Sequence, residues 1–118
     1  MIELPAQAPM AELQRYVHDL EAMHGWLDVD LVHNCFLMGE EVGELFKAVR
    51  NLEEARGASD ENIEASPDHL SAIGEEIIDV FNYLLAIANR LEIDVEHAFR
   101  IKNERNQQRT WTTTAGSD

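Results

Sequence analysis

Residues 39–46 read GEEVGELF, and residues 74–81 repeat the pattern as GEEIIDVF. Each copy holds two acidic residues, three positions apart, inside an apolar pattern of helical period. The aligned acids are Glu41 and Glu44 in the first copy and Glu76 and Asp79 in the second. The repeat predicts two long helices that each carry a pair of carboxylates.

Apolar residues around the repeat form stripes of the kind that bury one face of a helix. A helix turns about 100° per residue, so residues three or four apart share a face. Packing of the two stripes would place the four aligned acids at a common rim of the core, with Glu40 and Glu75 farther out. The expected stripes are Met38, Val42, Leu45, Val49 and Leu52 in the first helix, and Ile73, Ile77, Val80, Leu84, Ile87 and Leu91 in the second.

Carboxylates at the edge of a core are costly unless they are paired, solvated or bound to a metal ion. Four of them without a cation would repel one another and raise one another's pKa. Such a set of oxygen ligands is suited to a hard divalent cation. Two plainer interpretations stay open at this point: a solvated helix surface, and a duplicated helical hairpin with no activity.

Local signals place the ends of the remaining helices. Pro9 fits a first helical turn, and Gly25 is typical of a helix end. Ser66 and Asp94 are expected N-caps, and Pro67 fits the first position after its cap. We expect helices over about residues 9–24, 31–52 or a little beyond, 67–91 and 95–109.

Strand-like alternation is absent from the sequence, and two long helices with two shorter ones predict a small all-α four-helix bundle. We expect one domain over residues 1–118, with its core over about 10–110. The polar stretch at about 53–66 is expected to be a flexible connection, and residues 110–118 a loose tail.

Composition narrows the functional classes. The chain has 118 residues and a formal charge of −14, which argues against binding nucleic-acid polymers or anionic membranes by general electrostatics. The single cysteine, Cys35, cannot form an intrachain disulfide, and no cysteine cluster suggests zinc. No signal peptide or membrane span is expected from the apolar runs, so we expect a reducing, cytoplasmic compartment.

A second polar cluster occurs near the end of the expected fourth helix. Lys102, Asn106 and Arg109 are spaced i, i+4, i+7 and therefore share one face. Two cations and an amide on one stripe suit a polyphosphate, because Arg can make bidentate contacts to phosphate. The alternative is a solvated helix end, where basic residues are favoured.

These motifs closely resemble the MazG-like all-α nucleoside triphosphate pyrophosphohydrolases, a superfamily that includes the dimeric dUTPases. The resemblance runs from about Leu13 to Arg109 and rests on the His-Gly-Trp segment at 24–26, EEVGE at 40–44, EEIID at 75–79 and the late Lys/Asn/Arg run. One departure is the spacing: the 31 residues between Glu44 and Glu76 exceed the usual separation. The extra residues are expected in the connection at about 53–66, so the departure affects the structure of that loop and not the four aligned acids.

The resemblance implies hydrolysis of a (d)NTP between its α and β phosphates, giving a (d)NMP and pyrophosphate. It implies that the four aligned acids bind Mg²⁺, with Mn²⁺ as a substitute, and that the ion positions phosphate and activates water. Glu41 is the candidate base because it lies closest to the apolar rim, and Glu40 is the second. Lys102 and Arg109 would hold the outer phosphates, and Asn106 phosphate or sugar.

Aromatic residues supply candidates for contact with the base. Trp26 at the first helical corner and Tyr83, one turn beyond Asp79, are the candidates, although core packing is the commoner role of an aromatic. Glu21 and His24 match the carboxylate–histidine spacing of di-iron bundles, but those proteins use two such motifs and no second one is present.

Several apolar residues lie off the main stripes and could pack between subunits, so we expect a homodimer or homotetramer. They are Phe36, Phe46, Ile78, Phe81 and Leu85. The alternatives are a dUTPase- or dCTPase-like pyrimidine nucleotide hydrolase, and a non-catalytic helical oligomerisation or regulatory module. The sequence leaves base and sugar preference, ion number and biological role open.

Overall fold

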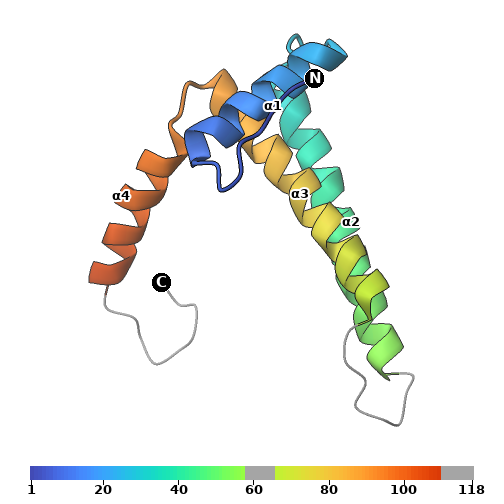
Figure 1. The fold of residues 1–118 in the computed structure, drawn as a ribbon. Coiled ribbons are helices and arrows are strands. Elements are labelled where there is room, and N and C mark those ends of the chain that lie inside the picture. Colours follow the sequence, from blue (N-terminus) through green and yellow to red (C-terminus); the bar gives the residue numbers. More distant parts are fainter. Residues whose placement is uncertain (58–65, 110–118) are drawn as a thin grey trace.

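The computed structural model describes residues 1–57 and 66–109, and this part of the chain contains helices and no strand. The four helices are α1 (Met10–His24), α2 (Leu31–Gly57), α3 (Pro67–Arg90) and α4 (Val95–Gln108), as Figure 1 shows. The all-α prediction is confirmed. The predicted tail and most of the predicted connection, at 58–65, lie outside the described residues. Within the described ranges, no helix has the length and apolarity needed to cross a membrane.

The helix ends follow the local signals. Ser66 Oγ accepts a hydrogen bond from the His69 backbone N–H at 3.2 Å, and Asp94 Oδ1 accepts one from His97 at 3.0 Å. Both predicted N-caps are therefore confirmed. Gly25 ends α1 with a φ of 74°, in the left-handed region that glycine adopts without strain. One boundary differs: α2 continues to Gly57, so the first part of the expected connection is helical.

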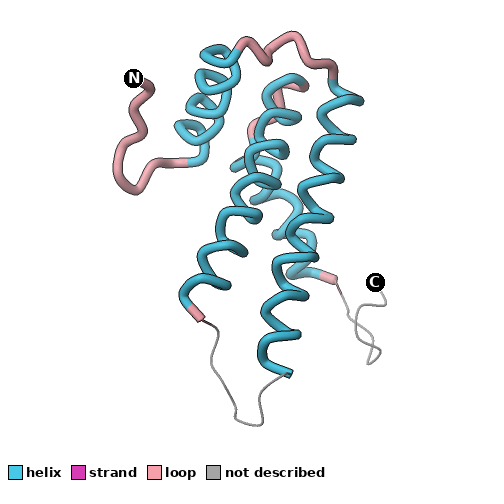
Figure 2. The backbone as a smooth tube through the Cα atoms, turned by 90° about the vertical axis from the view of Figure 1, so that its right-hand side faces the viewer, coloured by secondary structure: helices cyan, strands magenta, loops and turns pink. Residues whose placement is uncertain are grey.

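The two long helices α2 and α3 run antiparallel, side by side, along most of their length (Figures 1 and 2). Helix α1 packs on α3 near the end of the hairpin where α2 begins. The core at this junction consists of Val17, Leu85 and Ala86, with Met10, Leu13, Phe81 and Val95 packed against it.

The buried face of α3 differs from the predicted stripe. Leu85, expected between subunits, is the most buried large side chain at 1% exposure, and Phe81 packs on the same core. Ile77, Leu84 and Leu91, expected in the core, are about half exposed. The reason is α1: its Val17 packs against Leu85 and Ala86 in the C-terminal half of α3, so that face of the helix is buried there.

Helix α4 diverges from the hairpin and gives the chain an open shape (Figure 1). Its first turn is anchored by Gln14, whose Oε1 accepts from the Val95 N–H at 3.1 Å while Nε2 donates to Ile93 O at 2.9 Å. Beyond this anchor no residue of α4 is buried. The radius of gyration is 17.9 Å, against roughly 13–14 Å for a compact domain of this length. One chain therefore does not form a closed four-helix bundle.

Candidate metal centre and adjoining cavity

Three of the predicted ligands meet where α2 faces α3. Glu41 on α2 and Glu76 and Asp79 on α3 each present a carboxylate oxygen, and these oxygens lie within 4.8 Å of one another. The spacing of three residues between Glu76 and Asp79 puts both on the face of α3 that meets Glu41. This separation allows one divalent cation to contact all three side chains.

Within residues 1–57 and 66–109, no basic side chain forms an ion pair with this group. Glu76 Oε2 is buried and has no hydrogen-bond partner among the described residues. Burial raises the pKa of Glu41, and the neighbouring charges of Asp79 and Glu76 raise it further. A buried acceptor without a partner is costly, and a cation would relieve both this cost and the repulsion. The donor set consists of carboxylate oxygens, which fits Mg²⁺ and Mn²⁺.

The fourth predicted ligand, Glu44, is not part of this group. It lines a separate hollow of about 260 Å³ between α2 and α3, together with Glu76, Lys47 and His69. Glu44 lies one helical turn from Glu41 and faces farther round α2. Glu40, the second candidate base, is exposed beside Glu41.

The raised pKa of Glu41 predicts how the stability of the metal-free protein depends on pH. Because the folded-state pKa lies above the ordinary 4.5, the contribution of Glu41 to the free energy of unfolding is fully present below pH 4.5 and is lost as the pH rises through the folded pKa. In EDTA, Glu41→Gln should therefore stabilise the protein at neutral pH and not at about pH 4.

Magnesium should reverse this loss in the wild type. At a hundredfold excess over Kd, a bound ion adds about 2.7 kcal/mol to the free energy of unfolding. Thermal unfolding followed by circular dichroism, with EDTA or Mg²⁺, checks both effects. Equal responses of wild type and Glu41→Gln to Mg²⁺ would contradict the assignment of Glu41 as a ligand.

A cavity of about 350 Å³ adjoins the carboxylate group, because Glu41 and Asp79 line both. Its walls come from α1, the α1–α2 connector, α2 and α3, and most of their surface is apolar, with polar atoms from three carboxylates, two amides and the Tyr83 hydroxyl. The lining residues are Val17, Leu20, Glu21, Trp26, Val29, Asn34, Leu37, Glu41, Asp79, Asn82, Tyr83 and Ala86. Apolar walls with a few polar groups are typical of small-molecule sites.

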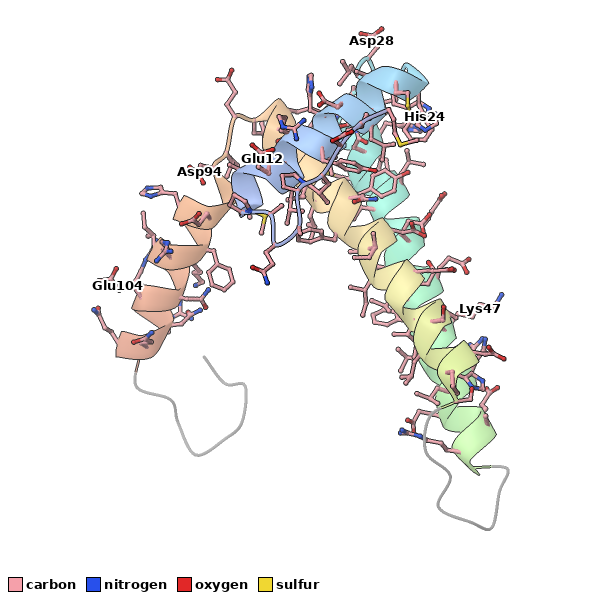
Figure 3. The ribbon with its side chains drawn as sticks, in the orientation of Figure 1. Glu12, His24, Asp28, Lys47, Asp94 and Glu104 are labelled. Atoms are coloured by element: carbon pink, nitrogen blue, oxygen red, sulfur yellow. The ribbon has the colours of Figure 1, made fainter. Side chains whose placement is uncertain are left out.

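Both predicted base contacts line this cavity. Burial raises the pKa of the Tyr83 hydroxyl, and the charges of Glu41 and Glu40 add to the effect. Tyr83 therefore remains a hydrogen-bond donor at neutral pH. Trp26 is about half exposed and its ring stacks on that of His24, with centroids 4.4 Å apart. Figure 3 shows His24 at the end of α1, close to the connector that carries Trp26.

The predicted phosphate contacts are not brought to this group within one chain. Lys102, Asn106 and Arg109 belong to the end of α4, which points away from α2 and α3 (Figure 1). Figure 3 shows the same separation between Glu104 on α4 and Lys47 on α2. Asn106 donates a hydrogen bond to Asn103 Oδ1 at 3.2 Å.

The sequence pattern did not identify four residues that line the cavity or hold its wall. They are Glu21, Asn34, Asn82 and Arg90. Asn34 and Asn82 are amides within apolar runs, a signal that could have marked them as buried polar groups with a role. Glu21 forms a nearly buried ion pair with Arg90 at 2.8 Å. This pairing, together with the stacking of His24 on Trp26, places both members of the di-iron-like motif in other interactions.

No protein-family model and no curated protein sequence matches the chain. The resemblance inferred from its motifs therefore stays a prediction. Support for a function comes from the geometry of the carboxylate group and the cavity beside it.

Proposed function

We propose that this chain is a Mg²⁺-dependent, MazG-like nucleoside triphosphate pyrophosphohydrolase that converts a (d)NTP to a (d)NMP and pyrophosphate. One observation supports the proposal above the others: an apolar cavity large enough for a nucleobase shares Glu41 and Asp79 with a three-carboxylate group. A nucleotide has the matching two parts, a flat ring and an oxygen-rich anion that Mg²⁺ can bind.

The reaction assigns different roles to these residues. Bound Mg²⁺ would neutralise phosphate charge and lower the pKa of a water molecule. Glu76, Asp79 and one oxygen of Glu41 would hold the ion, and Glu41 would also accept the proton of the attacking water. The water oxygen bonds to the α-phosphorus, the bond from that phosphorus to the bridging oxygen breaks, and pyrophosphate leaves.

The cavity would hold the base. Trp26 offers an aromatic face, and Tyr83 offers a protonated hydroxyl. The amide of Asn82 supplies a donor and an acceptor suited to the polar edge of a base. Asn34 offers only its Oδ1 as an acceptor, because its Nδ2 donates to Val29 O and Asp30 O. This set is compatible with an uncharged heterocycle and does not by itself select one base.

The experiment that tests the proposal is a nucleotide panel with product analysis. The purified protein, with Mg²⁺ and with EDTA, is incubated with each canonical (d)NTP and with the diphosphates. Magnesium-dependent formation of monophosphate and pyrophosphate supports the proposal. Cleavage of diphosphates too would favour the dUTPase-like alternative. Absence of hydrolysis across the panel would favour the non-catalytic module.

We further propose that a second copy of the chain covers the exposed apolar residues of α2 and α4. Phe36 and Phe46, expected between subunits, are 70% and 69% exposed in one chain, and Phe99 on α4 is 65% exposed. Charge also favours this partner: four of the nine basic residues lie between positions 100 and 109, while the carboxylate group lies on α2 and α3. Helix α4 of the second copy would then supply cations to the phosphates.

The assembly has a direct test. Light scattering should give at least twice the chain mass of 13.4 kDa, and Phe46→Glu should shift the protein toward monomer because it would bury an unpaired charge. Asn51→Glu introduces the same charge about 140° round α2 and should leave the mass unchanged. A monomeric wild type would contradict the proposed assembly.

A further inference from the structure

Arg90, at the end of α3, joins three parts of the chain. Its Nη1 and Nη2 donate to the two carboxylate oxygens of Glu21, at 3.1 and 2.8 Å. Its Nε donates to Val29 O at 2.9 Å, Nη2 also donates to Trp26 O at 3.0 Å, and Nη1 to Ala86 O at 3.1 Å. The five N–H donors of a guanidinium are thus all used.

Two of these contacts hold the α1–α2 connector, residues 25–30. This segment is irregular: Trp26 O accepts a turn hydrogen bond from the Val29 N–H at 3.1 Å, and only Asp30 O, at the start of α2, accepts a helical one, from the Asn34 N–H at 3.0 Å. Arg90 binds the carbonyls of Trp26 and Val29, and the buried Asn34 amide donates to Val29 O at 3.1 Å and Asp30 O at 3.0 Å. The connector is therefore fixed against α2 and α3 by two side chains.

The same connector forms a wall of the cavity, because Trp26 and Val29 both line it. Glu21 lines it too, and its carboxylate is 9% exposed. Pairing with Arg90 balances the charge of Glu21 at this wall, whereas the described residues supply no ion-pair partner to the carboxylate group that also borders the cavity. Arg90 thus acts on both the shape and the charge of one wall without lining the cavity itself.

We propose that Arg90 is a positioning residue that sets the base-binding wall of the cavity through the carbonyls of Trp26 and Val29. The proposal rests on the proposed function for its ligand, an uncharged planar heterocycle. The competing explanation is an ion pair that only stabilises the fold. The two differ in what they predict for Arg90→Lys, since lysine keeps the positive charge next to Glu21 but lacks the planar fork that reaches both carbonyls.

The first measurement uses the protein alone. In a Trp111→Phe background Trp26 is the single tryptophan, and acrylamide quenching reports how freely it moves. Arg90→Lys should raise the quenching constant about twofold or more, because the connector loses two hydrogen bonds. Glu21→Gln is the matched control: it removes the charge pair, leaves the contacts of Arg90 to the carbonyls and should quench like the parent.

The second measurement uses the nucleotide that the wild type hydrolyses best. Arg90→Lys should raise KM roughly tenfold and change kcat by less than about threefold, because base binding is weakened while the carboxylate group is intact. Mn²⁺ affinity, measured by electron paramagnetic resonance, should stay at the wild-type value. A change that only weakens the fold would not raise KM selectively.

The results separate this proposal from the proposed function. Wild-type quenching in Arg90→Lys, or equal quenching in Glu21→Gln and Arg90→Lys, would overturn the positioning role whether or not nucleotides are hydrolysed. If the wild type hydrolyses none, the proposed function fails while the quenching result still decides the role of Arg90. Loss of the helical dichroism signal in both Arg90→Lys and Arg90→Gln would assign Arg90 to fold stability and overturn the proposal.

Discussion

Replacement of Glu41 by Gln is expected to lower the rate of pyrophosphate release by roughly a hundredfold to ten-thousandfold, the usual contribution of a general base. Gln has nearly the same shape but cannot accept the proton of the attacking water. It also removes one anionic oxygen from the group formed with Glu76 and Asp79, so Mg²⁺ affinity should fall as well. Steady-state assays of pyrophosphate at saturating Mg²⁺ separate the loss of the base from the loss of the ion.

The control for this substitution lies on α3. Glu75→Gln removes the same charge one position from Glu76, on an exposed side chain outside the carboxylate group. It should retain activity within about threefold, as expected for a surface change. Full activity in Glu41→Gln would contradict the catalytic role, and equal losses in both variants would point to net charge instead of a specific site.

Replacement of Leu85 by Ala is expected to lower the free energy of unfolding by about 2–5 kcal/mol, the range for large-to-small changes in a packed core. Leu85 is 1% exposed and packs with Val17 and Ala86, and the core at this junction is small. No other large side chain in the described part of the chain is buried as completely. Urea unfolding followed by circular dichroism measures the change.

The neighbouring Leu84 provides the matched control, since it is 47% exposed on the same helix. Leu84→Ala should cost less than about 1 kcal/mol, because it removes little buried surface. If Leu84→Ala and Leu85→Ala lowered the free energy of unfolding equally at every protein concentration, the face of α3 that carries Leu84 would be buried within one chain, as its sequence predicts. A cost for Leu84→Ala that grows with protein concentration would instead place Leu84 in the contact with a second copy.

Local sequence signals predicted the helices well because the interactions that end a helix are local. The Ser66 and Asp94 side chains accept hydrogen bonds from backbone groups three residues away. Gly25 adopts the left-handed conformation that ends α1 without needing a contact from a distant residue. The end of α2 was misplaced because polarity marks solvent exposure, and an exposed helical turn such as residues 53–57 is as polar as a loop.

Packing between distant segments was predicted less well. Periodicity gives the angles between side chains on one helix, but the position of α1 decides which face of α3 is buried, and that moved Leu85 into the core. The same limit applies to Glu44: it is three residues from Glu41, as Asp79 is from Glu76, so spacing alone does not tell which of these positions faces the opposite helix. The Glu21–Arg90 pair joins residues 69 positions apart, so no local pattern marks it.

The placement of the carboxylate group partway along the α2–α3 hairpin links ion occupancy to local order. Beyond this group, Leu52 is the one buried residue in the described parts of the hairpin's far end. Few buried contacts favour fraying. A cation shared by Glu41, Glu76 and Asp79 would cross-link α2 and α3 where this far end begins. The cross-link would oppose separation of the two helices. The integrity of half the hairpin would then vary with the concentration of free magnesium around it.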